Sequence, residues 1–165
     1  MVKRLQWCGW LVLLLLGVGA TSSCRFGQGK VIKIVSSLPM KGSALIQTQT
    51  MVNAIRMAVD EADSVAGPFH IEYEAWDDAT TQHRNWDAEQ ESINAHKAVA
   101  DPDVMVYIGT FNSGAARVAI PITNPANLVM ISPSATYVGL TQGGPYAQSG
   151  EPDCFYPNHQ RNFCR

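Results

Sequence analysis

The sequence predicts an α/β fold in which a mostly parallel, doubly wound sheet has helices on both faces. Apolar or β-branched runs alternate with longer segments of helical spacing, in the order β-α-β-α-β-α-β. Two of these runs, residues 104–108 and 128–131, lack the polar alternation of half-exposed strands, which is typical of strands buried in a parallel sheet. The 165 residues, 46% hydrophobic and 16% charged, suit one folded domain with a real core.

The first half of the chain contributes two predicted strands and one helix. Residues 31–37, "VIKIVSS", are a β-branched strand that leads into a loop containing Pro39 and Gly42. A helix with one apolar face follows this loop, and we expect the helix to end before Gly67. Residues 69–75, "FHIEYEA", alternate apolar and polar, which predicts a strand with one wet face near a sheet edge.

The second half repeats the alternation. Residues 82–100 are predicted to form a helix, with Trp86 and Ile93 filling its interface with the sheet. The buried strand 104–108 follows, and then a short helix from residue 115 that Pro121 and Pro125 should limit. These elements, with the strand at 128–131, place one domain at residues 31–140, whereas residues 141–165 are turn-rich.

The first 23 residues are predicted to be a secretory signal peptide. A basic segment precedes an apolar run at residues 10–18 that is too short to span a bilayer comfortably, so a transmembrane anchor is the less favoured alternative. Cleavage after Ala20 and lipidation of Cys24 both remain open. We favour lipidation, which would hold the protein at a membrane surface, with residues 24–30 as a tether.

The remaining cysteines do not predict a metal site. Cys154 and Cys164 lie close together in a chain that we expect to be exported, so they form a disulfide or stay as two free thiols. No CxxC or HxxxH spacing is present. We therefore predict no metal and no cofactor.

Small polar residues follow three predicted strands. The loops read "SSLPMKGS" at residues 36–43, "GTFNSG" at 109–114 and "SPSAT" at 132–136. In open parallel sheets, ligands bind beyond the carboxyl ends of the strands. Hydroxyls and backbone N–H groups can donate to a carboxylate, and hydroxyls can accept from an ammonium group, so the loops suit a zwitterion such as an amino acid.

The sequence lacks several motifs that are typical of enzyme active sites. The loop "GTFNSGAA" lacks the Lys and Ser/Thr of a phosphate loop, and neither a GxGxxG nor a GxSxG motif occurs. We expect the histidines on the surface, and Asp77 and Asp78 to cap loop N–H groups. A net charge of −2 gives no electrostatic footprint for nucleic acid. The sequence therefore favours a binding protein over an enzyme.

Several stretches together give the chain a family resemblance. They are "NAIRMAVDEAD" (53–63), "YEAWDDAT" (73–80), "YIGTFNSGAARVAIPITN" (107–124), "LVMISPSAT" (128–136) and "GEPDCFYPNHQRNF" (150–163). On these residues the chain resembles the branched-chain amino acid ABC transporter substrate-binding proteins, which are type I periplasmic binding proteins with a leucine-binding domain. The resemblance implies a Rossmann-like first lobe, with the second lobe missing beyond residue 165, so that we expect a truncated gene product or a fragment.

The resemblance also implies ligand-binding roles for four residues. Ser113 matches a serine that binds the ligand carboxylate, Ser134 a residue whose main chain meets the ligand, and Thr136 a threonine that contacts the amino acid head group. Gln47 falls where some members have an aromatic residue over the ligand, so leucine itself is not implied. The alternative is that Ser134 and Thr136 simply make a turn.

We therefore expect an exported solute-binding protein, periplasmic or at the cell surface. It would capture a branched-chain amino acid or a related small amide and pass it to the permease of an ABC transporter, with a lipid anchor as its link to the membrane. The alternative function is the ligand-binding ectodomain of a sensor or receptor with the same fold. Permease genes beside this one would favour transport, and a kinase gene would favour sensing.

Overall fold

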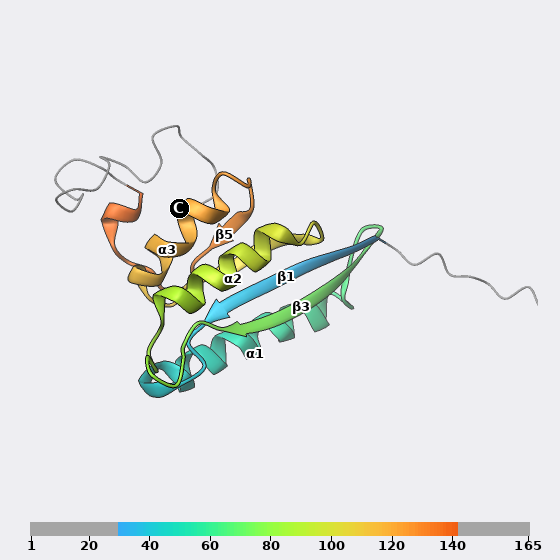
Figure 1. Cartoon of the computed structure of the whole chain (residues 1–165). Helices are drawn as coiled ribbons and strands as arrows, with labels where there is room; N and C mark the ends of the chain where they lie inside the picture. The colour runs from blue at the N-terminus through green and yellow to red at the C-terminus, as the bar shows by residue number, and fades with distance from the viewer. Residues whose placement is uncertain (1–29, 142–165) are drawn as a thin grey trace, which may run out of the picture.

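The computed structural model describes residues 30–141, which form one mixed sheet with helices on both faces (Figure 1). The strands are β1 (Lys30–Leu38), β2 (Val65–Ala66), β3 (Phe69–Asp77), β4 (Val104–Gly109) and β5 (Val129–Ile131), in the sheet order β2-β3-β1-β4-β5. All neighbouring pairs are parallel except β2 with β3. The predicted doubly wound fold is confirmed within these residues.

The helices cover the sheet in the arrangement that right-handed crossovers require. In Figure 1, α2 (Ala88–Ala100) and α3 (Ser113–Thr123) lie on one face, and α1 (Leu45–Glu61) lies on the other beneath β1 and β3. The Thr48 hydroxyl of α1 donates to Pro39 O over 2.6 Å, which fixes the first turn of α1 to the loop that leaves β1. Two short 3-10 turns, Gly42–Ala44 and Val138–Leu140, complete the described elements.

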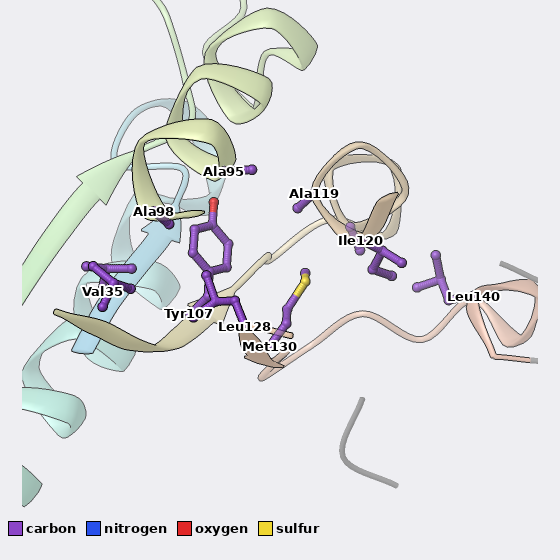
Figure 2. Close-up of a cluster of buried hydrophobic side chains, with 11 residues drawn as sticks. Val35, Ala95, Ala98, Tyr107, Ala119, Ile120, Leu128, Met130 and Leu140 are labelled. Carbon is purple, nitrogen blue, oxygen red and sulfur yellow. The ribbon is translucent and has the colours of Figure 1, made fainter. Parts of the chain in front are cut away.

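The main core lies between the sheet and the α2–α3 layer (Figure 2). Small side chains let the two helices approach closely, and larger ones from the strands fill the space beneath them. Tyr107 of β4 and Met130 of β5 are paired in register and almost fully buried, as is Ile120 of α3. Burying a side chain as large as Ile120 or Met130 contributes about 1.5–3 kcal/mol relative to leaving it exposed.

The start of α2 differs from the prediction, because the helix begins at Ala88 rather than at residue 82. Asp87 is its N-cap, and the Asp87 carboxylate accepts hydrogen bonds from the N–H groups of Glu89 and Gln90 at 2.9 and 3.2 Å. The other carboxylate oxygen accepts from Thr80 Oγ1 at 3.0 Å and lies 2.8 Å from His83 Nδ1. These contacts hold the preceding residues as a loop instead of a helical turn.

Other boundaries also differ. The helix α3 continues through Pro121 to Thr123, so Pro121 does not end it, whereas the helix does end before Pro125 as predicted. The prediction of a β4 buried on both faces is wrong at Met105, which is 47% exposed. The register between β1 and β4 shifts at this residue, and the extra residue of a β-bulge lies outside the regular pairing.

Several sequence predictions lie outside the described residues. These are the signal peptide, most of the tether, Cys24 and the pair Cys154 and Cys164. Within residues 30–141, no helix combines the length and the apolar character needed to cross a bilayer.

Candidate functional site

The exit loops of β1, β4 and β5 meet at one edge of the sheet, because these strands are parallel neighbours. Ser37 pairs with Gly109 at the ends of β1 and β4, and Ile108 pairs with Ile131 at the ends of β4 and β5. A side chain at Gly109 would place its Cβ 2.7 Å from Ser37 O. Glycine therefore permits the close approach of the two backbones just where the loops begin.

The predicted site residues Ser113 and Thr136 lie in contact. Ser113 is the first residue of α3, and its Oγ accepts hydrogen bonds from the N–H groups of Thr136 and Tyr137 at 3.2 and 3.3 Å. Thr136 is exposed, and its hydroxyl makes no hydrogen bond with any other residue of the 30–141 region. One hydroxyl therefore holds the loop, and the other faces solvent beside it.

Two further serines join the β5 exit loop to the β4 exit loop. Ser134 Oγ donates to Phe111 O over 2.6 Å, and Ser132 Oγ donates to Thr110 O over 2.8 Å. Ser132 Oγ also accepts the N–H of Ala135 at 2.8 Å, which closes a tight turn. The cluster of small hydroxyl residues thus builds the turn itself and orders the backbone of Ser134, which the sequence had suggested as a ligand contact.

The amino end of α3 opens into this loop cluster. No side chain caps the helix, and the first N–H groups of any α-helix have no partner within the helix. The positive end of the helix dipole adds to their attraction for an anion. The side-chain oxygen of Asn112, which precedes the helix, is buried without a hydrogen-bond partner in the described region, but as an acceptor it does not add to the attraction for an anion. The arrangement suits a carboxylate placed next to Ser113.

Gln47 is positioned differently from the other three residues. It lies exposed in the first turn of α1 and makes no hydrogen bond to Ser113, Ser134 or Thr136. The loop that leads from β1 into α1 is nevertheless held firmly, because Asp77 Oδ1 accepts the N–H groups of Met40 and Ala79 at 2.8 and 2.9 Å. Asp77 therefore caps loop N–H groups as predicted.

Three residues differ from the sequence interpretation. Asp78 is fully buried, and neither of its carboxylate oxygens has a partner among the described residues, so it is not a loop cap. Ile93 is 53% exposed and does not fill the helix–sheet interface. Trp86 packs instead against the first turn of α3, where a Cβ on Gly114 would lie 2.5 Å from Trp86 Cζ2. An isolated tryptophan in a polar segment gave no signal of this position.

No other feature of the described residues competes as a site. A cavity of about 250 Å³ lies at the opposite end of the sheet, between the end of α2 and the starts of β4 and β5, away from the hydroxyl cluster. Among residues 30–141, no group of three or more His, Cys, Asp or Glu side chains is placed to hold a metal ion. The strand-exit edge remains the candidate binding site.

Comparison with known proteins places this chain in a family. The sequence matches the family model described as periplasmic binding protein over residues 31–159. The chain belongs to the periplasmic binding protein family. No curated protein shows significant similarity to it.

Solved structures of this family share the fold of the described lobe. The substrate-binding protein LivJ of a branched-chain amino acid transporter from Streptococcus pneumoniae, in complex with isoleucine, is 26% identical with a TM-score of 0.57, over 67% of this chain and 30% of its own. An ABC transporter substrate-binding protein from Desulfitobacterium hafniense, in complex with Leu, is 21% identical with a TM-score of 0.52. The match covers 66% of this chain and 30% of that protein.

A third neighbour binds a different kind of acid. It is a solute-binding protein of an ABC transporter from Rhodopseudomonas palustris in complex with 3,4-dihydroxybenzoic acid, 21% identical with a TM-score of 0.57, over 65% of this chain and 28% of its own. This periplasmic binding protein chain therefore spans about 30% of the length of the neighbours that it matches.

Proposed function

We propose that the chain supplies the first lobe of an extracytoplasmic solute-binding protein that delivers a small ligand to an ABC transporter. The ligand is an amino acid of the branched-chain type or a related small amide. The observation that carries the proposal is the contact between Ser113 and Thr136 at the uncapped amino end of α3. The family match and the isoleucine complex of a neighbour support it.

In this proposal the described lobe binds the carboxylate of the ligand. Isoleucine and leucine, named for two neighbours, share an amino acid head group, and 3,4-dihydroxybenzoic acid, named for a third, has only the carboxylate of that head group. The N–H groups at the start of α3 and the free hydroxyl of Thr136 are donors for such a group. A hydrogen bond to a charged group contributes about 1.5–3 kcal/mol.

The other predicted residues take secondary roles. The backbone of Ser134 contacts the ligand from the β5 exit loop, and Gln47 lies over it from α1. A polar Gln47 would favour a ligand with an amide or hydroxyl over one with a purely apolar side chain. Binding and release of the ligand occur without covalent chemistry. The partner that receives the ligand is a permease. A lipid on Cys24 is the proposed link to the membrane.

The experiment is an amide NMR titration of the full chain with isoleucine, benzoate and isoleucinol. Ligand concentrations on the order of millimolar are needed, because one lobe buries only part of a ligand. We expect isoleucine and benzoate to shift the amide signals of Ser113, Gly114 and Thr136. Isoleucinol keeps the ammonium and the side chain but lacks the carboxylate, so it should not shift them. Equal shifts with isoleucinol, or none with any of the three, would contradict the proposal.

A further inference from the structure

Two carboxyl groups are buried just below the strand-exit edge, and ligand binding gives neither of them a role. Asp78 directly follows β3, and Glu91 lies in the first turn of α2. Both side chains have no solvent exposure at all. Burial of an ionised carboxylate without a balancing cation is costly, so the occurrence of two such groups close together calls for a physical account.

Glu91 is held by hydroxyl groups on two strands. Ser37 Oγ of β1 donates to Glu91 Oε2 over 2.6 Å, and the Tyr107 hydroxyl of β4 donates to Oε1 over 2.7 Å. Figure 2 shows the ring of Tyr107 directed from β4 toward α2, with its oxygen at the helix. Asn94 Nδ2 donates to Ser37 Oγ over 2.9 Å and to Asp77 O over 3.0 Å, which extends the network to the end of β3. No cation takes part in these contacts.

The same contacts suit a protonated Glu91. The oxygen of Tyr107 can accept a hydrogen bond from a carboxyl O–H as well as donate one to a carboxylate. Asp78 has no hydrogen-bond partner for either oxygen within residues 30–141, which also favours its neutral form.

The charged groups around the pair do not offset its negative charge. Asp77 at the end of β3 lies close enough to Asp78 to disfavour a second negative charge, and Asp78 acts in the same way on Glu91. Lys41 pairs with Asp77 and with Ala79 O rather than with the buried carboxyls. Tyr107 of β4 is the remaining titratable group in contact, and α3 carries one charged residue, Arg117, which is not among the groups that shift either carboxyl.

We propose that Asp78 and Glu91 form a buried proton-binding switch beneath the exit loops of β1, β3 and β4. With protons bound, the network joins α2 to β1 and β4. Loss of the protons leaves negative charges inside the lobe and weakens the attachment of α2 to the sheet.

The titration range of the pair follows from its burial. Burial raises the pKa of Asp78 from 3.8 to about 7, with the charge of Asp77 adding to the rise. Burial also raises the pKa of Glu91 from 4.5 to about 8, although the hydrogen bonds from Ser37 and Tyr107 oppose it. A raised pKa means that the folded state binds more protons than the unfolded state. The stability that these protons contribute is therefore fully present below the pKa values of the unfolded state, and it is lost as pH rises through about 7–8.

The test is equilibrium unfolding of the full chain in urea between pH 6 and pH 9. The equilibrium constant for unfolding should rise by about tenfold or more over this interval. Glu91→Gln and Asp78→Asn keep the shapes of the side chains but cannot ionise. Each should therefore reduce the change of the unfolding equilibrium constant with pH. Glu89→Gln is the matched control, because it removes an exposed carboxylate from the same helical turn and should leave the rise unchanged.

A second measurement does not depend on whether the variants fold. Infrared spectra of the wild-type chain in D₂O at pH 6 should contain the carbonyl stretch of a protonated carboxylic acid, and this band should disappear by pH 9. Its absence at pH 6 would overturn the proposal, as would a wild-type unfolding profile that is flat or that falls between pH 6 and 9.

Discussion

The N–H of Thr136 donates to Ser113 Oγ over 3.2 Å, which joins two residues that stand 23 positions apart in the chain. Ser113 begins a helix and Thr136 follows a strand, so the contact is made by two different exit loops of the same sheet. Ser113 Oγ holds the loop as an acceptor, so its O–H remains a donor for a ligand, together with the Thr136 hydroxyl and the first N–H groups of α3.

Thr136→Ala should weaken ligand binding by about 1–3 kcal/mol, because it removes a hydroxyl donor to a charged group. The backbone N–H that contacts Ser113 remains, so the free energy of unfolding should change by no more than about 0.5 kcal/mol. Titration by NMR or calorimetry measures the first effect, and urea unfolding measures the second. Thr136→Ser keeps the hydroxyl and should bind nearly as the wild type does. An unchanged affinity in Thr136→Ala would mean that the Thr136 hydroxyl does not bind the ligand.

The sequence predicted which loops meet at one edge of the sheet better than it predicted the contacts within those loops. Apolar runs identify the strands, although Val129 and Ile131 of β5 are each 37% exposed, and parallel order then brings the loops after β1, β4 and β5 to one edge. Which hydroxyl faces solvent and which holds a turn depends on backbone geometry that residue type does not encode. Ser132, Ser134 and Thr136 look alike in the sequence, yet the first two are occupied within the protein.

The elements that the sequence missed have local physical causes. The strand β2 has two residues and pairs through its backbone after Asp63 and Ser64 adopt positive φ values of 52° and 53°. Side-chain periodicity carries no information about so short an element. The burial of Glu91 was equally hidden, since a charged residue in a polar helix reads as solvent-exposed until Ser37 and Tyr107 are seen to contact it.

Gly114→Ala should destabilise the lobe, although alanine is the better helix former by up to about 1 kcal/mol. The new Cβ would lie 2.5 Å from Cζ2 and 3.0 Å from Cη2 of Trp86, so the indole must move. Overpacking of this kind costs about 1–3 kcal/mol, which exceeds the gain in helix propensity. Urea unfolding measures the difference.

The control for this substitution is the Trp86→Leu background, in which the clash is absent. There Gly114→Ala should be neutral or stabilising, so the double-mutant cycle should give a clear coupling energy. If Gly114→Ala costs the same in both backgrounds, Trp86 is not the reason that glycine is required at this position.

Asp87→Asn should separate the charge of the α2 cap from its hydrogen-bonding shape, since Asn is also a good N-cap. The N–H of Gln90 and the contact with His83 hold the pKa of Asp87 below 3.8. A group whose pKa is lowered by folding contributes stability at pH values above its pKa in the unfolded state. This stability is lost as pH falls through its pKa in the folded state. Thermal unfolding should therefore show wild type more stable than Asp87→Asn at pH 6. The difference should vanish in strong acid, whereas a difference that persists there would mean that charge is not its source.

Tyr107→Phe should destabilise the lobe by about 1–3 kcal/mol, because it leaves Glu91 Oε1 buried without its donor. A hydrogen bond to a carboxylate is stronger than one to a neutral acid, so its loss should raise the pKa of Glu91 further. The cost should accordingly be larger at pH 9 than at pH 6 in urea unfolding. Tyr73→Phe is the matched control, since the Tyr73 hydroxyl contacts Ser36 at 2.6 Å on a different strand and not Glu91. A pH-independent cost in Tyr107→Phe, equal to that of Tyr73→Phe, would mean that Tyr107 does not act through the charge of Glu91.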